Sequence, residues 1–146
     1  MKKIIITAIA LLAAGIAGAF AAPDAPIDAE KLPQSIREFV AKHFPGDKIA
    51  FAKVDRGIFD TEYNVLLSSG TKMEFAGNGE WTEIKSKYSS VPESIVPQQI
   101  ADAVASRYPT AKIVQIDRGR HDYEVELSNG MDITFDMQFN ITDIDD

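Results

Sequence analysis

Acidic side chains that alternate with apolar ones are the feature of this sequence with the clearest chemical potential. Over residues 122–127 and 131–136, carboxylates fall at nearly every second position. A β-strand directs successive side chains to opposite faces, so a period of two gathers the acids on one face and the apolar residues on the other. The corresponding residues of the first half are mixed in charge. The residues expected on this polar face are Glu62, Asn64, Leu66, Lys72 and Glu74 in the first half, and Glu124, Glu126, Asp132, Thr134 and Asp136 in the second.

This polar face is open to three interpretations. It is the solvated side of an amphipathic sheet, or it is a docking face for a basic partner, because charges of one sign focus the local field. Carboxylates at this spacing also suit weak Ca²⁺ binding, and Asp143, Asp145 and Asp146 extend the acidic end. The sequence contains no EF-hand-like loop of oxygen ligands, so it predicts no specific calcium site.

The tripeptide Asp-Arg-Gly occurs twice, as Asp55-Arg56-Gly57 and as Asp117-Arg118-Gly119. We expect each copy in a loop between two strands, where glycine permits a positive φ. A functional interpretation is an exposed tip that touches a partner through its charged residues. The loop candidates are Asp55, Arg56, Asp117 and Arg118.

Residues typical of catalysis and metal binding are scarce in this chain. It has two histidines, His43 and His121, and no cysteine, and the histidines do not form the closely spaced pairs of zinc sites. Gly-x-Ser-x-Gly, Walker and Gly-x-Gly-x-x-Gly patterns are absent. We expect His43 at a helix C-terminus, where the helix dipole favours a cation, and His121 in a solvated turn. The sequence therefore predicts a protein that is not an enzyme and has no catalytic residues, cofactor or metal site.

The first residues have the pattern of a signal peptide. Lys2-Lys3 precedes an apolar run over residues 4–20 that ends in the small-residue site Ala19-Phe20-Ala21. A retained membrane anchor is the alternative, although the run is short for a span of about 20 residues. We predict a signal peptide over residues 1–21, cleavage after Ala21, and a periplasmic or secreted bacterial protein without a membrane span. Residues 22–29 contain two prolines and are expected to be a flexible leader.

Composition limits the class of partner. The 146 residues are 45% hydrophobic, which is enough for a core, and carry a formal net charge of −7. A nucleic-acid-binding protein needs clustered Lys and Arg to displace counterions, so this class is excluded. A protein or peptide, and a basic one in particular, is the expected partner.

Two segments, residues 30–88 and 89–146, repeat one another. Leu32-Pro33-Gln34-Ser35-Ile36 recurs as Val96-Pro97-Gln98-Gln99-Ile100, and the two Asp-Arg-Gly copies follow in the same order. Each segment begins with apolar residues at helical spacing that end at an aromatic-Pro pair, Phe44-Pro45 or Tyr108-Pro109. Each helix is followed by four predicted strands, over 48–54, 61–67, 71–75 and 81–85 in the first segment, and 113–116, 123–127, 131–135 and 140–144 in the second.

These motifs together resemble the PepSY-like family of β-lactamase-inhibitor-like periplasmic proteins. The resemblance is carried by the aromatic-Pro pairs, the Val91-Pro92 to Val96-Pro97 lead-in and the strand residues that follow. In the first copy these are Tyr63, Val65, Leu67, Ser68, Gly70, Met73, Phe75 and Trp81, and in the second Tyr123, Val125, Leu127, Ser128, Gly130, Ile133, Phe135 and Ile141.

The resemblance implies an α+β fold by tandem duplication, like β-lactamase inhibitor protein, in which each helix region packs on a four-stranded antiparallel sheet. It also implies secretion and no assigned enzymatic activity. This chain lacks the cysteines of the disulfide-bonded namesake inhibitors and shows no match to an inhibitory loop. One helix covers one face of a sheet, so the other face is expected to be open.

Two functions follow as hypotheses. The first is a non-catalytic binding module that recognises a protein or peptide through the open sheet face, with an inhibitor-like mode as one form of it. The alternative is an envelope metal-handling (Ca²⁺) protein or an enzyme that uses the acidic face. The absence of a nucleophile–base pattern favours the first.

Overall fold

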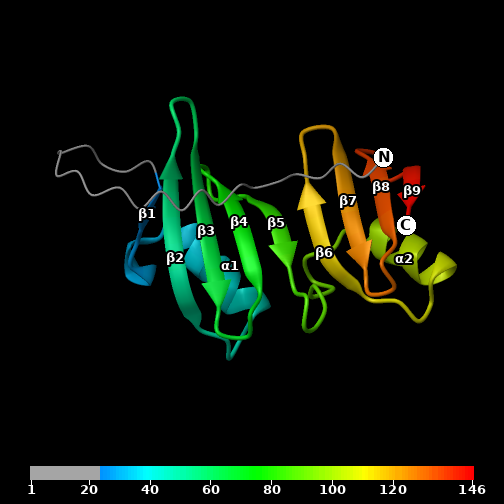
Figure 1. The fold of residues 1–146 in the computed structure, drawn as a ribbon, viewed down its shortest axis with the longest axis horizontal. Helices are drawn as coiled ribbons and strands as arrows, with labels where there is room; N and C mark the ends of the chain where they lie inside the picture. The colour runs from blue at the N-terminus through cyan, green and yellow to red at the C-terminus, as the bar shows by residue number, and fades with distance from the viewer. Residues whose placement is uncertain (1–23) are drawn as a thin grey trace.

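The computed structural model describes residues 24–146, so the predicted signal peptide and its cleavage site lie outside the described residues. In this part of the chain, one antiparallel sheet runs in chain order and two helices pack against it (Figure 1). The elements are β1 (Asp24–Pro26), η1 (Ala29–Lys31), α1 (Gln34–His43), β2 (Ile49–Arg56), β3 (Thr61–Leu67), β4 (Lys72–Ala76), β5 (Trp81–Lys85), α2 (Gln98–Arg107), β6 (Ile113–Arg118), β7 (Asp122–Leu127), β8 (Asp132–Asp136) and β9 (Ile141–Asp145).

The fold is α+β, and its strands form a single nine-stranded sheet rather than two separate four-stranded sheets. The sheet is continuous because β5 pairs with β6 through Glu83–Lys85 and Gln115–Asp117. Ile84 and Ile116 face each other in this pairing and are fully buried. The apolar side of the sheet therefore continues across the join between the two halves, which we call the seam.

Both helices begin after a proline and end at an aromatic residue that precedes another proline. Pro33 and Pro97 occupy the N-cap positions, and the chain leaves helical geometry at Phe44 and Tyr108. A residue before proline is disfavoured in the α region, which explains the common stop. Figure 1 shows both helices on the same side of the sheet, so the opposite side has no helix over it.

One hydrophobic core lies between the helices and the sheet and includes residues of both halves. Phe75 and Phe135 are fully buried in it, and Phe39 of α1 meets Phe75 edge-on at 5.5 Å between ring centroids. The predicted inward residues are confirmed. Val65, Phe75, Trp81, Tyr123, Val125 and Phe135 are buried, while Tyr63 and Ile141 are half-buried and pack against the same core.

The seam has further contacts besides strand pairing. The Arg118 guanidinium donates to the carbonyl oxygen of Trp81 from Nε at 3.1 Å and from Nη2 at 2.8 Å. It also lies 4.3 Å from the centre of the Trp81 ring. The Nδ1 atom of His43 lies 2.8 Å from the hydroxyl oxygen of Ser94, which joins the end of α1 to the connector before α2.

The segment expected to be a flexible leader contains β1 and the start of η1. Asp24–Pro26 pairs with β2, the Ile27 amide donates to the Ala52 carbonyl at 3.0 Å, and Ile27 packs against the core. The Nζ atom of Lys53 lies 3.0 Å from a carboxylate oxygen of Asp24. These contacts hold residues 24–27 against the sheet edge, which their proline content does not reveal.

The two hairpins that carry Asp-Arg-Gly differ in length. Ile49 faces Leu67 and Ile113 faces Leu127, and a bulge follows at the same place in each pair. Beyond the bulge, β2 and β3 continue for two more residue pairs, Asp55 with Glu62 and Arg56 with Thr61. Counted in residue pairs from the bulge, Asp117 therefore occupies the same place in the sheet as Lys53. In the repeated tripeptide, by contrast, Asp117 matches Asp55.

Candidate functional site: the open sheet face

The sheet surface opposite the helices, which we call the open face, carries the polar residues predicted from the alternation. Asn64 lies opposite Glu74, Glu124 opposite Thr134, and Glu126 opposite Asp132. Their sequence neighbours point into the core, which fixes the outward direction of this set. The structure therefore brings the predicted residues together on β3, β4, β7 and β8: Glu62, Asn64, Leu66, Lys72, Glu74, Glu124, Glu126, Asp132, Thr134 and Asp136.

Asp136 has a local structural contact that the alternation does not show. One of its carboxylate oxygens accepts hydrogen bonds from the amides of Gln138 and Asn140, each at 2.9 Å. These contacts, together with the Asn140 side chain, hold the pKa of the Asp136 carboxyl below its usual range. Asp136 thus organises the turn between β8 and β9.

At the centre of the open face, three carboxylates from three adjacent strands lie side by side. Glu74 of β4 lies opposite Glu83 of β5, and Glu83 lies opposite Asp117 of β6. We call Glu74, Glu83 and Asp117 the carboxylate row. The row lies across the seam and continues to Glu124 of β7.

The row is partly removed from water and is bridged by hydrogen bonds. The side-chain amide of Gln115 donates to Glu83 at 2.7 Å and to the two oxygens of Asp117 at 3.3 and 3.2 Å. The Glu74 and Asp117 carboxyls lie close enough to the Glu83 carboxyl to influence its pKa. The row therefore gathers three like-charged groups around the Gln115 amide.

Burial and mutual repulsion raise the pKa values of all three carboxyls. For Glu83, burial and then the charge of Glu74 raise the pKa to about 7. For Asp117, burial and then the charge of Glu83 raise the pKa to about 6. The pKa of Glu74 is raised by burial and by Glu62. The row therefore changes its charge near neutral pH, where ordinary carboxylates are fully ionised.

Charge is unevenly distributed along the open face. One line of cross-strand neighbours begins with Lys72 and Lys85 on β4 and β5 and passes through Gln115 on β6. It ends with Glu126, Asp132 and Asp145 on β7, β8 and β9. The first half of the face is thus partly basic, and the second half is acidic.

The prediction that Asp-Arg-Gly forms loops is wrong for its charged residues. Asp55 and Arg56 are the last residues of β2, and Asp117 and Arg118 are the last residues of β6. Asp117 belongs to the carboxylate row, and Arg118 binds Trp81 at the seam. Only the glycines lie in the hairpin turns, where an added Cβ at Gly57 or Gly119 would come within 2.7 Å of the following Asp60 or Asp122 carboxylate.

Sequence reasoning missed Glu83 and misplaced Asp117. A register shift between β4 and β5 puts both Trp81 and Ile84 on the core side, three residues apart. The alternation of inward and outward side chains breaks at this point, so a strict period of two does not predict that Glu83 points outward. The β6 bulge shifts the phase of Asp117 in the same way. A bulge has no distinctive residue type, so the sequence does not reveal it. The only available signal was that the second copy of Asp-Arg-Gly comes two residues earlier in its segment than the first copy does.

The histidines stand apart from this site. His43 is the last residue of α1, as expected, but burial and then the charge of Lys42 lower its pKa, so the expected cation is disfavoured there. His121 is exposed in the turn between β6 and β7. Among residues 24–146, no group of three or more His, Asp or Glu side chains is arranged to hold a metal ion.

The fold and the site define a class: a small antiparallel α+β protein whose sheet is covered by helices on one face and open on the other. The chain belongs to the family described as "Putative beta-lactamase-inhibitor-like, PepSY-like", whose model matches residues 61–143.

Solved structures of similar proteins extend the likeness over most of the chain. A "putative periplasmic protein from DUF2874 family" from Bacteroides vulgatus is 50% identical, with a TM-score of 0.81, and the match covers 84% of this chain and 97% of that one. A "putative calcium-regulated periplasmic protein" from Bacteroides thetaiotaomicron is 40% identical, with a TM-score of 0.81 and the same coverage. A second Bacteroides vulgatus protein, described as periplasmic and of unknown function, is 38% identical, with a TM-score of 0.80 and coverage of 84% and 99%.

No match to a curated protein was found. Neither the family description nor the descriptions of these relatives point to catalysis. Within residues 24–146, neither helix is both long and apolar enough to cross a membrane.

Proposed function

We propose that this chain is a periplasmic or secreted, non-catalytic binding protein that recognises a basic protein or peptide through the open face. Both helices pack on one side of the sheet, which leaves the other side accessible to a partner. The inhibitor-like family description supports a protein partner. The signal-peptide pattern and the periplasmic relatives support the location.

The carboxylate row is the observation that carries this proposal. Glu83 and Asp117 are half-buried, and their pKa values are raised because too little positive charge lies nearby to offset burial and repulsion. An ammonium or guanidinium group from a partner would supply that charge and favour the ionised carboxylates. A charge-assisted hydrogen bond in such a partly desolvated place is stronger than one in water.

The acidic second half of the face supports the same kind of partner. Glu126 lies directly opposite Asp132, and Asp132 lies opposite Asp145. Like charges directly across strands are unfavourable for folding, so they suggest a role in solubility or binding. A face of one sign also steers an oppositely charged partner and speeds its association at low salt.

A second candidate is calcium-dependent binding. One relative, 40% identical, is described as calcium-regulated. The carboxylate row and Glu124 supply oxygen atoms, the type of ligand that Ca²⁺ prefers, although within residues 24–146 they are not arranged as a metal site, so the description of the relative carries this candidate. A rise in melting temperature with CaCl₂, absent with matched NaCl and weaker in Glu83→Gln, would support this candidate. No rise would remove it.

We also propose that the fold arose by tandem duplication, with units over residues 30–88 and 89–146. The helix and four strands of α1–β5 recur in the same order in α2–β9. This origin accounts for two similar halves that present different open-face residues.

Capture of binding proteins from the periplasm of the source organism tests the main proposal. The bait is the processed chain, and the comparison bait carries Glu124→Gln, Glu126→Gln and Asp132→Asn, which remove charge and keep shape. We expect partners with basic surfaces to bind the unmodified bait, to elute as salt rises, and to bind the variant weakly.

A charge-matched variant outside the open face serves as the control. Glu30→Gln, Glu80→Gln and Glu93→Gln also remove three exposed carboxylates, none of them among the open-face residues. The melting temperatures of both variants should stay close to that of the unmodified protein, because exposed charges contribute about 0–1 kcal/mol each. Equal capture by all folded baits would contradict the proposal.

A further inference from the structure

β9 is the last strand of the sheet and, among the residues that the structure describes, has a neighbouring strand on one side only (Figure 1). At the other end of the sheet, β1 is three residues long and ends in Pro26, which has no backbone N–H to donate. A short edge strand with a proline resists the addition of a further strand. β9 spans five residues, Ile141–Asp145, and none of them is proline. It therefore presents a regular strand edge to which another strand can pair.

β9 takes the same place in the second half as β5 takes in the first. The bulge in the pairing of β4 with β5 recurs at the same position in the pairing of β8 with β9. The Thr82 hydroxyl donates to the Glu74 carbonyl at 3.3 Å. In the same way, the Thr142 hydroxyl donates to the Thr134 carbonyl at 3.4 Å. The two strands thus match residue by residue: Trp81 with Ile141, Glu83 with Asp143, Ile84 with Ile144, and Lys85 with Asp145.

The two strands differ in what lies beyond them. β5 is followed in the sheet by β6, and Ile84, which lies opposite Ile116, is fully buried. Within residues 24–146 no strand lies beyond Ile144, which is half-buried and packs at the margin of the core. The apolar side of the sheet is therefore closed at β5 and stays partly exposed at β9. A strand that resembles β6 would cover it.

The backbone of Ile144 also faces this outer side. In an antiparallel pair, alternate residues exchange hydrogen bonds with the neighbouring strand. The Ser86 amide donates to the Val114 carbonyl of β6 at 2.8 Å, so Ile84, two residues earlier, also faces β6 with its amide and carbonyl. By the match in register, Ile144 directs its amide and carbonyl away from β8. An added strand would meet the same donor and acceptor that β6 meets at Ile84.

Charge decides which kind of strand fits this edge. Asp143 lies opposite Thr134 and Asp145 lies opposite Asp132, so both belong to the open-face side of β9. Two copies of β9 placed side by side would bring acids next to acids, which is unfavourable across strands. The edge therefore disfavours a second copy of this chain. A strand with lysine or arginine on the same side would be attracted to it instead.

We propose that the edge of β9 binds an extended segment of a basic polypeptide, which joins the sheet as a further strand antiparallel to β9. An apolar residue of the segment pairs with Ile144, as Ile116 pairs with Ile84. The residues on either side of it are basic and lie opposite Asp143 and Asp145. The class of partner rests on the proposed function, whereas the place and the mode of binding, backbone pairing at a sheet edge, go beyond it.

Calorimetric titration of the processed chain with a defined peptide tests the proposal. The probe is acetyl-Ile-Val-Lys-Ile-Lys-Arg-amide, which is the sequence of β6 with lysine in place of Gln115 and Asp117. In the register of β5 with β6, these lysines lie opposite Asp145 and Asp143. The arginine keeps the place of Arg118, so it can donate to the carbonyl of the strand residue that matches Trp81.

Two methylated forms of the probe separate strand pairing from simple adhesion. A methyl group on the amide of the second isoleucine removes the hydrogen that would bond to the Ile144 carbonyl. A methyl group on the amide of the following lysine points away from β9, because adjacent residues alternate in direction. We expect the first form to bind about tenfold more weakly than the probe, and the second to bind within about twofold of it.

Charge exchange tests the register. Asp143 is exposed, so Asp143→Lys should remain folded, which a melting curve checks. This variant should bind the probe about fivefold more weakly. Glutamate in place of the second lysine of the probe should restore the affinity, and glutamate in place of the first lysine should not.

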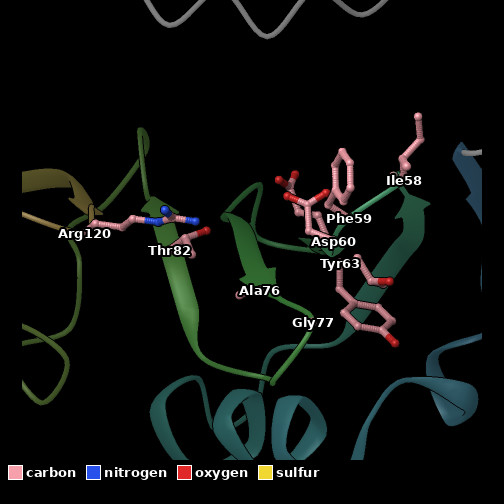
Figure 2. A pocket seen from close by; sticks show the side chains of 11 residues that line it. Ile58, Phe59, Asp60, Tyr63, Ala76, Gly77, Thr82 and Arg120 are labelled. Carbon is pink, nitrogen blue, oxygen red and sulfur yellow. The ribbon is translucent and has the colours of Figure 1, made fainter.

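Two control variants of the protein exclude other sites. Glu93→Lys makes the same charge change at an exposed position away from the sheet edge. Phe59→Ser removes an apolar side chain that is 98% exposed, at a hairpin end where Figure 2 shows Ile58 and Phe59 pointing away from Ala76 and Gly77. An apolar probe that merely adheres to the protein would favour this hairpin end. We expect both variants to bind the probe like the unmodified protein.

Four results would overturn the proposal: no binding of the probe, equal weakening by the two methyl groups, rescue of Asp143→Lys by glutamate at either place, and binding lost in Phe59→Ser but kept in Asp143→Lys. The open-face variant with Glu124→Gln, Glu126→Gln and Asp132→Asn keeps the β9 edge, so the comparison of the methylated probes applies to it unchanged. Undiminished periplasmic capture by that variant would contradict the proposed function and leave the result at the edge in place.

Discussion

The hairpin between β2 and β3 is longer than the hairpin between β6 and β7 and ends in Ile58 and Phe59 rather than Arg120 and His121. The pairing nearer the core is the same in both, from the Ile49–Leu67 and Ile113–Leu127 pairs through the bulge. The two halves therefore agree where they contact the shared core and differ where they meet solvent. Packing restricts the inward residues, while outward residues are free to acquire separate roles.

The open face shows the same contrast. Lys72 and Lys85 lie opposite each other in the first half, whereas Glu126 and Asp132 do so in the second. The carboxylate row crosses the seam between these regions. A partner that lies across the seam would meet first the lysines, then the carboxylate row with its raised pKa values, and then the acidic second half. The difference between the halves therefore gives the face a direction.

The largest effects are expected where the halves are alike. Phe75 and Phe135 are both fully buried at matching positions on β4 and β8. Phe75→Ala and Phe135→Ala should each lower the free energy of unfolding by about 3–5 kcal/mol, measured by urea denaturation. Phe75→Ala should cost slightly more, because it also loses the edge contact with Phe39. Costs below about 0.5 kcal/mol for both would contradict the shared core.

The two arginines of Asp-Arg-Gly should separate sharply. Arg118→Met removes two hydrogen bonds to the Trp81 carbonyl and the contact with its ring, so it should lower the free energy of unfolding by about 2 kcal/mol. Arg56 is exposed and makes no side-chain hydrogen bond or ion pair among the residues described. Arg56→Met should change stability by less than about 0.5 kcal/mol. Equal effects in urea denaturation would show that Arg118 does not stabilise the seam.

These arginines also show what sequence could predict. Periodicity located both helices, the core residues and most of the open face, because helix and strand periods follow directly from which side is buried. The identical tripeptides indicated identical surroundings, yet one arginine lies at the seam and the other at an exposed strand end. The difference comes from a hairpin extended by two pairs, and strand register depends on pairing between distant residues.

The candidate site was predictable at its edges and not at its centre. Glu124 and Glu126 follow a regular alternation, so their shared face could be deduced. Glu83 and Asp117 meet only because β5 pairs with β6, a contact between the two halves that neither half reveals alone. Their raised pKa values follow from that contact, and single-sequence patterns carry no information about it.

The pH dependence of stability tests this contact. Glu83 and Asp117 bind protons more tightly in the folded chain, with pKa values of about 7 and 6, against ordinary values of 4.5 and 3.8. Their contribution is fully present below the ordinary values and is lost as pH rises through the folded values. Glu83→Gln should therefore stabilise the protein at pH 8 by about 1–2 kcal/mol, after allowance for solvent screening, and by little at pH 4.

Thermal melting across this pH range provides the measurement, and Glu126→Gln on the acidic half is the control. Glu126 has the same charge on the same face but lies outside the row, so its replacement should not produce the same pH-dependent gain. An identical pH profile for the unmodified protein and Glu83→Gln would show that folding does not raise the pKa of Glu83.

The smallest effect concerns a turn contact found in the first half only. Asp47 accepts hydrogen bonds from the Ser68 hydroxyl at 2.6 Å, the Lys48 amide at 3.0 Å and the Ser69 amide at 3.2 Å, and one from the Ser69 hydroxyl. Asp47 precedes Lys48. In the second half, the residue before the matching Lys112 is Ala111, which packs against the core. These hydrogen bonds lower the pKa of Asp47, so the ionised form stabilises the fold above the ordinary pKa of 3.8, and the gain is lost as pH falls through the lower folded value.

Asp47→Ala should lower the melting temperature slightly at pH 7 and not at pH 2, the opposite trend to the carboxylate row. A deficit that persists unchanged in acid would mean that the side chain acts through packing rather than charge, and the two turns would then differ in shape and not in electrostatics.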